Sequence, residues 1–158
     1  MISELQNLLQ SRRQTLAFAE SCTGGLVSAT LTQHPGVSSF YLGSVISYSN
    51  ELKKNILHVS ESLLRTVGAV SSPVALEMAR GLKTLTGADW TVSITGIAGP
   101  AGGTKDKPVG TVYFAVCGPG FEMSQRKLFP GNRQQIQETA MKHSFELLTK
   151  SLKGEPWT

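Results

Sequence analysis

The feature that most constrains the fold is a buried strand that runs into a glycine-rich turn and then into a helix. Residues 15–19 (TLAFA) are apolar and rich in strand-forming types, and residues 26–31 (LVSATL) begin a helix. The turn between them (ESCTGG) holds two hydroxyls, a thiol and two glycines. Glycines let a backbone approach a ligand closely, and the unpaired N–H groups of a helix start attract anions. The segment therefore predicts either an anion-binding turn or a plain turn in which Ser21 or Thr23 caps the helix.

The rest of the chain repeats this alternation of strands and helices. Further strands are expected at 40–48, 90–94, 111–116 and 121–129, and helices near both ends, from 49 to 54 and from 71 to 87. We expect a single α/β domain over residues 1–158 with three layers. Its mixed, mostly parallel sheet is covered by helices, and its last two strands form a late antiparallel hairpin. Ligands bind at the carboxyl ends of parallel strands, so the turns at 20–25 and 95–100 are expected to face one crevice.

Charge and composition favour a soluble enzyme-sized domain over a nucleic-acid binder. The formal net charge is +4 in 158 residues, and no run of basic residues is longer than two. A nucleic-acid surface usually shows clustered lysine and arginine, so we expect no nucleic-acid partner. A mild positive field suits a small anionic substrate.

The cysteines and the apolar runs indicate a reduced compartment without a membrane segment. The two cysteines form neither a disulfide framework nor a CxxC motif. The first residues lack the pattern of a signal peptide, and no apolar run reaches about 20 residues. We therefore expect a cytoplasmic protein with no membrane partner.

Metal and cofactor chemistry find no support in the sequence. His34, His58 and His143 lie far apart, without a carboxylate or cysteine at ligand spacing, and packing or surface roles are expected for them. The chain contains neither GxGxxG nor GxxxxGK[ST]. We expect no metal and no cofactor.

Nucleophilic catalysis is the class that the sequence favours, with Ser21 as nucleophile. A serine hydroxyl needs a base, and no histidine lies near the turn, so a lysine with a lowered pKa is the alternative. Lys53 lies one turn into a helix that follows the second strand, and Lys54 would then face elsewhere. Lys105 and Lys107 lie in a polar loop and are weaker candidates. The plain alternative is that both Lys53 and Lys54 are solvated helix residues.

Other polar residues of these turns are candidates for supporting roles. Thr95 could position the lysine or the nucleophile, and the N–H groups from Gly96 to Gly99 could receive an oxyanion or phosphate. Glu20 could orient a base or bind a hydroxyl. Arg133, at the start of the last helix, could fork onto phosphate oxygens or simply be exposed.

Five segments taken together resemble the CinA C-terminal domain family. They are residues 19–25 (AESCTGG), 48–53 (YSNELK), 68–71 (GAVS), 95–100 (TGIAGP) and 107–112 (KPVGTV), in order and with family-like spacing. The characterised activity of that family is nicotinamide-nucleotide amidase. The length fits a stand-alone domain without the larger N-terminal domain that some members carry.

The resemblance implies a phosphorylated nucleotide substrate and assigns roles to named residues. It implies hydrolysis of the carboxamide of nicotinamide mononucleotide to nicotinate mononucleotide and ammonia, in pyridine nucleotide salvage. Ser21 would be the nucleophile, Lys53 the base or activating cation, and Thr95 a helper in the same network. The motif residues Thr23, Gly24, Gly25, Tyr48 and Asn50 would line the pocket, and Arg133 would meet the phosphate. Glu20, Gly96 and Gly99, singled out above, are also expected to contact the substrate.

One residue departs from the family pattern, and two other functions stay open. Asn132 stands where the family often has aspartate before the arginine, which bears on the orientation of Arg133. The first alternative is a catalytically silent nucleotide-binding or regulatory member. The second is an accessory to nucleic-acid processing, against which the lack of a basic stripe speaks. A homodimer is the expected assembly.

Overall fold

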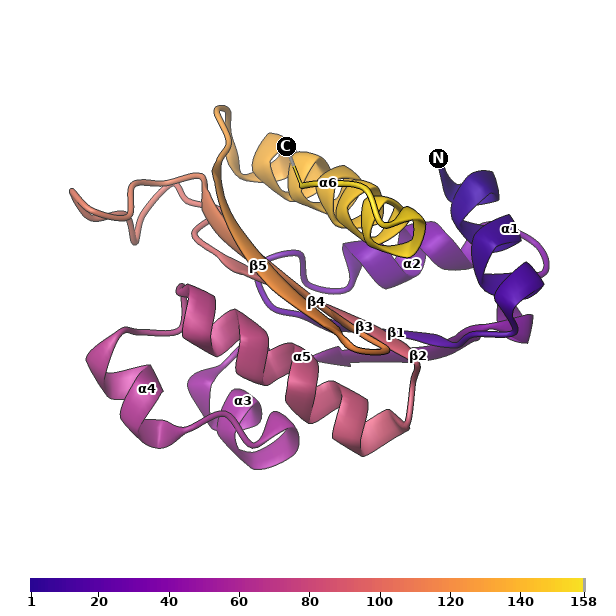
Figure 1. The fold of residues 1–158 in the computed structure, drawn as a ribbon. Helices are drawn as coiled ribbons and strands as arrows, with labels where there is room; N and C mark the ends of the chain where they lie inside the picture. The colour runs from indigo at the N-terminus through magenta and orange to yellow at the C-terminus, as the bar shows by residue number, and fades with distance from the viewer. Residues whose placement is uncertain (158) are drawn as a thin grey trace.

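The computed structural model describes residues 1–157, in which a five-stranded sheet lies between two layers of helices (Figure 1). In chain order the elements are α1 (Ile2–Arg12), β1 (Leu16–Glu20), α2 (Leu26–Thr32), the 3₁₀ turn η1 (Val37–Ser39), β2 (Tyr41–Ile46), α3 (Asn50–Leu57), α4 (Glu61–Thr66), α5 (Ser72–Thr86), β3 (Trp90–Gly96), β4 (Thr111–Gly118), β5 (Phe121–Leu128) and α6 (Arg133–Lys153).

The sheet has the order β2-β1-β3-β4-β5 and is mixed. β1 pairs in parallel with both β2 and β3, whereas β3–β4 and β4–β5 are antiparallel. This confirms the expected α/β fold with its late hairpin. Because β1 and β3 are parallel neighbours, the turns that follow them lie side by side at one edge of the sheet.

Helices cover both faces of the sheet, with α1, α2 and α6 on one side and α3, α4 and α5 on the other (Figure 1). All five residues of β1 are buried, and alternate side chains serve the two layers. Phe18 packs against Phe145 of α6 with its ring 5.9 Å away, while Ala17 and Ala19 join the cluster under α5. The strand is thus fixed from both sides, which holds the residue after it in place.

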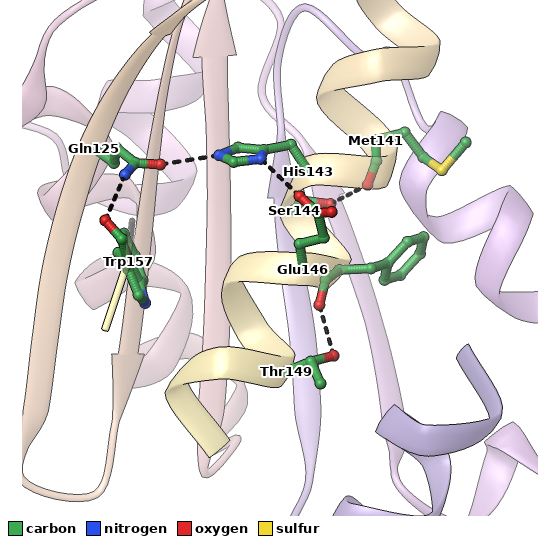
Figure 2. Close-up of polar contacts among 8 residues, drawn as sticks. Gln125, Met141, His143, Ser144, Glu146, Thr149 and Trp157 are labelled. Atoms are coloured by element: carbon green, nitrogen blue, oxygen red, sulfur yellow. Dashed lines mark hydrogen bonds and ion pairs between the residues drawn. The ribbon is translucent and has the colours of Figure 1, made fainter. Parts of the chain in front are cut away.

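His143 fastens α6 to the last two strands of the sheet (Figure 2). Its Nε2 donates to Gln125 Oε1 at 2.9 Å, and its Nδ1 lies 3.1 Å from Glu146 Oε2. The ring also packs edge-on against Phe114 and Phe129. Burial lowers the pKa of His143. The packing role expected for this histidine is confirmed.

The structure shifts some expected boundaries by a few residues. β2 is shorter than expected because the chain leaves the sheet after Ile46 and Ser49 then caps α3, its Oγ accepting from Leu52 N–H at 3.1 Å. The pairing of β2 with β1 skips one residue just before Gly43, which is the register shift of a β-bulge. Ser71 stands at the N-cap of α5, but its hydroxyl donates to the Gly68 carbonyl instead of capping the helix. None of the helices in residues 1–157 is long and apolar enough to span a membrane.

Candidate active site

The turns after β1 and β3 and the start of α6 enclose a cavity of about 200 Å³. Ser21, the first residue beyond β1, is anchored to β3 because its N–H donates to the Ile94 carbonyl at 3.0 Å. The expected crevice at the carboxyl ends of the parallel strands is therefore present. Its lining consists of Ser21, Cys22, Tyr48, Asn50, Lys53, Ala69, Val70, Thr95, Gly96, Ala98 and Arg133.

Ser21 and Lys53 are brought into contact across the cavity floor. Lys53 Nζ donates to Ser21 Oγ at 3.0 Å, and Ser21 is 7% and Lys53 only 1% exposed. Helix α3 places the lysine there because its capped start fixes the direction in which its first turn points. The alternative of a solvated Lys53 is wrong for this position. Lys54, the next residue, instead pairs with Glu51 and Glu61 on the surface.

The other contacts of Lys53 are backbone carbonyls, not carboxylates. Its Nζ donates to the carbonyls of Ser47 at 2.7 Å and Tyr48 at 3.2 Å. Burial without an acidic partner disfavours the charged ammonium and lowers the pKa of Lys53 from 10.5 to about 8. A neutral amine has two N–H groups and one lone pair. With both N–H groups on the two carbonyls, the lone pair is left for the hydroxyl of Ser21, which is the geometry of a general base.

Glu20 occupies the helix start that the sequence marked as an anion-binding turn. Its buried carboxylate accepts from the N–H groups of Gly25, Val27 and Ser28 at 2.8–3.1 Å and from the Thr23 hydroxyl at 2.7 Å. The N–H groups that open α2 are therefore engaged by the protein's own carboxylate. The expectation that they attract an external anion is wrong, because a side chain from the preceding strand takes that place.

Thr95 lies at the cavity, but its side chain hydrogen-bonds to neither Ser21 nor Lys53. Its hydroxyl donates to the Ala69 carbonyl at 3.0 Å and so holds the segment before α5 against β3. Gly96 beside it leaves no room for a side chain, because an added Cβ would lie 2.8 Å from the Thr111 carbonyl oxygen and 3.1 Å from Cys22 Sγ. In the second turn, the N–H of Ile97 donates to the same carbonyl of Thr111.

Arg133 reaches the cavity from the first turn of α6. Its guanidinium donates to the Gly99 carbonyl at 2.8 Å and to the Tyr48 hydroxyl at 3.0 Å. Asn132 caps the helix, accepting from Gln135 N–H at 3.0 Å within a full capping box. The amide thus supplies the same capping acceptor that an aspartate would, so the departure from the family pattern leaves the start of α6 intact.

The cavity gathers seven of the predicted site residues and leaves five outside its lining. Those that line it are Ser21, Tyr48, Asn50, Lys53, Thr95, Gly96 and Arg133. Those that do not are Glu20, Thr23, Gly24, Gly25 and Gly99, which belong to the turns behind it.

Sequence reasoning missed four lining residues and one supporting contact. Cys22, Ala69, Val70 and Ala98 line the cavity, although all four lie within the segments already singled out. The supporting contact is made by Gln137 of α6, whose amide donates to the Cys22 carbonyl at 2.8 Å. No spacing rule could have linked residues 115 positions apart.

Cys22 is not a competing nucleophile at neutral pH. Burial raises the pKa of its thiol to about 12, so it stays protonated. The thiolate is the reactive form of cysteine, and the adjacent hydroxyl of Ser21 is the group that faces the lysine.

The fold and the Ser21–Lys53 pair define an α/β protein with a candidate serine–lysine site at the ends of its parallel strands. A family model described as the CinA C-terminal domain matches residues 1–152, and the chain belongs to that family. A CinA-like protein of Desulfotalea psychrophila is 50% identical over 144 residues, which cover 91% of this chain and 35% of that protein. One from Thermotoga maritima is 49% identical over 150 residues, covering 93% and 36%. The chain thus spans about a third of the length of these relatives.

Solved structures of the family share the whole fold. A CinA superfamily protein from Klebsiella pneumoniae has a TM-score of 0.93 and 35% identity, with 97% of this chain and 96% of that chain covered. A competence/damage-inducible protein from Agrobacterium tumefaciens has a TM-score of 0.92 and 32% identity, with 96% and 93% covered.

Proposed function

We propose that this protein is an amidohydrolase that converts nicotinamide mononucleotide to nicotinate mononucleotide and ammonia. The observation that carries the proposal is the 3.0 Å contact between Ser21 Oγ and the buried Nζ of Lys53. An activated nucleophile beside a base of lowered pKa is the arrangement that acyl transfer requires.

The first half of the reaction forms an acyl-enzyme. Ser21 Oγ attacks the carboxamide carbon while neutral Lys53 takes the hydroxyl proton. The tetrahedral intermediate collapses, its C–N bond breaks, and Lys53 returns the proton to the departing nitrogen as ammonia leaves. The carbonyls of Ser47 and Tyr48 hold the ammonium during the intermediate, because a protonated Lys53 has three N–H groups for its three acceptors.

The second half restores the enzyme. A water molecule attacks the ester carbon, and Lys53 accepts one of its protons. Breakage of the ester bond then returns that proton to Ser21 Oγ and frees the carboxylic acid, whose own proton passes to solvent to leave the carboxylate product. Each proton taken by Lys53 is given back within the same half-reaction, so no further acid or base is required.

Arg133 and Tyr48 support a phosphorylated substrate. The Arg133 guanidinium stands at the cavity with a carbonyl and a phenol as its hydrogen-bond partners. A guanidinium held in this way can exchange a neutral partner for two phosphate oxygens, a contact that is stronger because both partners are charged. The cationic Arg133 at the rim and the Ser21–Lys53 pair on the floor would hold the phosphate and carboxamide ends of one ligand.

The experiment that tests the proposal is ammonia release from nicotinamide mononucleotide by the wild type, Ser21→Ala and Lys53→Ala. Lys54→Ala is the matched control, because Lys54 is the next lysine of α3 and forms surface ion pairs. We expect turnover by the wild type and the control, and a loss of orders of magnitude in the other two. An inert wild type whose melting temperature still rises with the nucleotide would identify a silent binding member instead.

The assembly and the location of the protein stay predictions. A homodimer is expected, and a monomer mass by light scattering would reject it. Cytoplasmic localisation is expected from the cysteine usage and the lack of a signal-peptide pattern. Cell fractionation tests it.

A further inference from the structure

Glu20 is a fully buried carboxylate that is satisfied without any cation. Its Oε2 accepts from Thr23 Oγ1 at 2.7 Å and from the N–H groups of Gly25 and Val27 at 3.0 and 3.1 Å. Its Oε1 accepts from Ser28 N–H at 2.8 Å and, at 3.4 Å, from Ser44 Oγ. Among the ion pairs of residues 1–157, none involves Glu20. The carboxylate is held by the turn, the start of α2 and, through Ser44, the neighbouring strand β2. These five donors are called the Glu20 cage below.

The cage and a contact with β3 together fix the backbone around the candidate nucleophile. Glu20 ends β1, and its side chain reaches forward over Ser21 to groups between Thr23 and Ser28. On the other side, the N–H of Ser21 is tied to Ile94 of β3. The backbone of Ser21 is therefore fixed by a strand contact and by a closed turn, which sets the position and direction of its Cα–Cβ bond.

The cage keeps the negative charge of Glu20 away from Lys53. The contacts of Lys53 Nζ are Ser21 Oγ and the carbonyls of Ser47 and Tyr48, and no carboxylate oxygen is among them. A buried lysine paired with a carboxylate would be held in its charged form and would be a poor base. The carboxylate of Glu20 is instead engaged by backbone N–H groups and hydroxyls. Glu20 therefore directly precedes Ser21 in the sequence without being the counter-ion of Lys53.

We propose that Glu20 is a positioning residue whose caged carboxylate holds the turn so that Ser21 Oγ faces Lys53. This inference rests on the proposed function, in which Ser21 is the nucleophile. It replaces the expected contact of Glu20 with substrate, because the carboxylate lies off the cavity with both oxygens engaged.

The substitution Glu20→Gln keeps the size of the side chain but replaces one acceptor oxygen with an NH₂ donor. Both carboxylate oxygens of Glu20 face only donors, three at one oxygen and two at the other. The NH₂ group of a glutamine would have to face either Val27 N–H or Ser28 N–H, donor against donor. The turn must open at one of these points, because a buried donor without an acceptor is costly.

The test compares Glu20→Gln and Thr23→Val with two matched controls. Thr23→Ser keeps the hydroxyl that binds Glu20, whereas Thr23→Val removes it at similar size. Asp89→Asn alters a comparable contact at the other end of β1, where the carboxylate accepts from the N–H and the hydroxyl of Thr15. It therefore reports what the change from a carboxylate to an amide costs in stability at a contact far from the site.

Three quantities are measured on each protein: kcat and KM for ammonia release, the free energy of unfolding in urea, and the rate at which an alkyl fluorophosphonate labels Ser21. In labelling, Ser21 Oγ bonds to phosphorus, fluoride leaves and Lys53 takes the proton, so the rate reports the Ser21–Lys53 geometry without the natural substrate. Intact mass follows the product, with Ser21→Ala as the blank.

We expect Glu20→Gln to lower both kcat and the labelling rate by about 100-fold, because small displacements of a nucleophile cost factors of this size, with KM changed less than about threefold. Thr23→Val should show a smaller loss that Thr23→Ser restores. Asp89→Asn should lose stability and keep kcat. The inference would be overturned if the folded Glu20→Gln variant were less stable but still labelled and turned over at the wild-type rate.

The outcomes separate this inference from the proposed function. If the wild type labels at Ser21 but releases no ammonia, the amidase fails, and the labelling rates of the variants alone decide the role of Glu20. If the wild type turns over and Glu20→Gln does also, only the positioning role fails. If the wild type neither labels nor turns over, both fall.

Discussion

Replacing Lys53 with methionine should remove a pH dependence of stability that only a buried, unpaired lysine produces. The side chain is 1% exposed and has no carboxylate partner among its contacts, so its ammonium is stabilised by three oxygen atoms alone. Methionine fills a similar space without a charge. The carbonyls of Ser47 and Tyr48 lose a donor in the variant, which adds an offset that does not change with pH.

The direction follows from the lowered pKa of Lys53, which falls from 10.5 to about 8 on burial. Between these values the unfolded chain binds the proton and the folded chain does not, so stability rises as the pH rises through this window. Below pH 8 both states carry the proton, and the cost of burying the charge is present in full. Integration of the proton difference gives a rise of about 2.5 kcal/mol between pH 7 and pH 10 in the wild type.

Urea unfolding of the wild type and Lys53→Met at pH 7, 8, 9 and 10 measures this term directly. The other titrating groups are common to both proteins and cancel in the difference of their unfolding free energies. We expect that difference to move in favour of the wild type by about 2.5 kcal/mol over the range. Lys54→Met, which alters an exposed lysine of the same helix, should show a much smaller change. A difference for Lys53→Met that stays flat would refute a lowered pKa.

Three further outcomes follow from the structure. Gly81→Ala places a Cβ against the Leu57 carbonyl, where α5 packs on α3, and should destabilise the protein by about 2 kcal/mol or more in urea; an unchanged midpoint would show that these helices have room to part. Arg133→Met should raise KM for nicotinamide mononucleotide about tenfold with little change in kcat, whereas an equal loss in kcat would assign Arg133 to the chemical step. Burial raises the pKa of Cys22 to about 12 and that of Cys117 to about 11, so iodoacetamide at pH 8 should label both thiols only after unfolding. Rapid labelling of the native protein, measured by intact mass, would contradict this.

The fold was predictable because local sequence and tertiary packing agree. The apolar run at 15–19 predicted a buried strand, and the structure buries every residue of β1. The hairpin from β4 to β5 follows from two adjacent strand patterns and a Gly-Pro-Gly turn. Strand ends were less predictable. β2 ends at Ile46 because Ser49 caps α3 shortly after it, and the capped segment cannot also pair with the sheet.

The candidate pair was predictable for a similar reason. Ser21 and Lys53 each follow a strand of one parallel unit, and parallel neighbours bring their carboxyl ends together. The sequence could not choose between a buried and a solvated Lys53, because that depends on which carbonyls the turn before α3 presents. Only the structure supplies the Ser47 and Tyr48 acceptors.

The supporting residues were the part that sequence could not place. Glu20 and Thr23 belong to the same motif as Ser21, but their side chains turn into the protein to form the cage instead of lining the cavity. Thr95 holds the Ala69 segment, and Gln137 supports Cys22 from the far end of the chain. A motif marks residues that act together, and three-dimensional contacts show which of them face the cavity.

Acid-quenched peptide mass spectrometry during turnover of nicotinamide mononucleotide tests the central claim most directly. With Ser21 as nucleophile and Lys53 as base, the wild type should carry the nicotinate mononucleotide acyl group on the peptide that contains Ser21. Ser21→Ala should show neither the adduct nor ammonia release. Ammonia release at the wild-type rate by Ser21→Ala, or an acyl group found on Cys22 instead, would contradict the account.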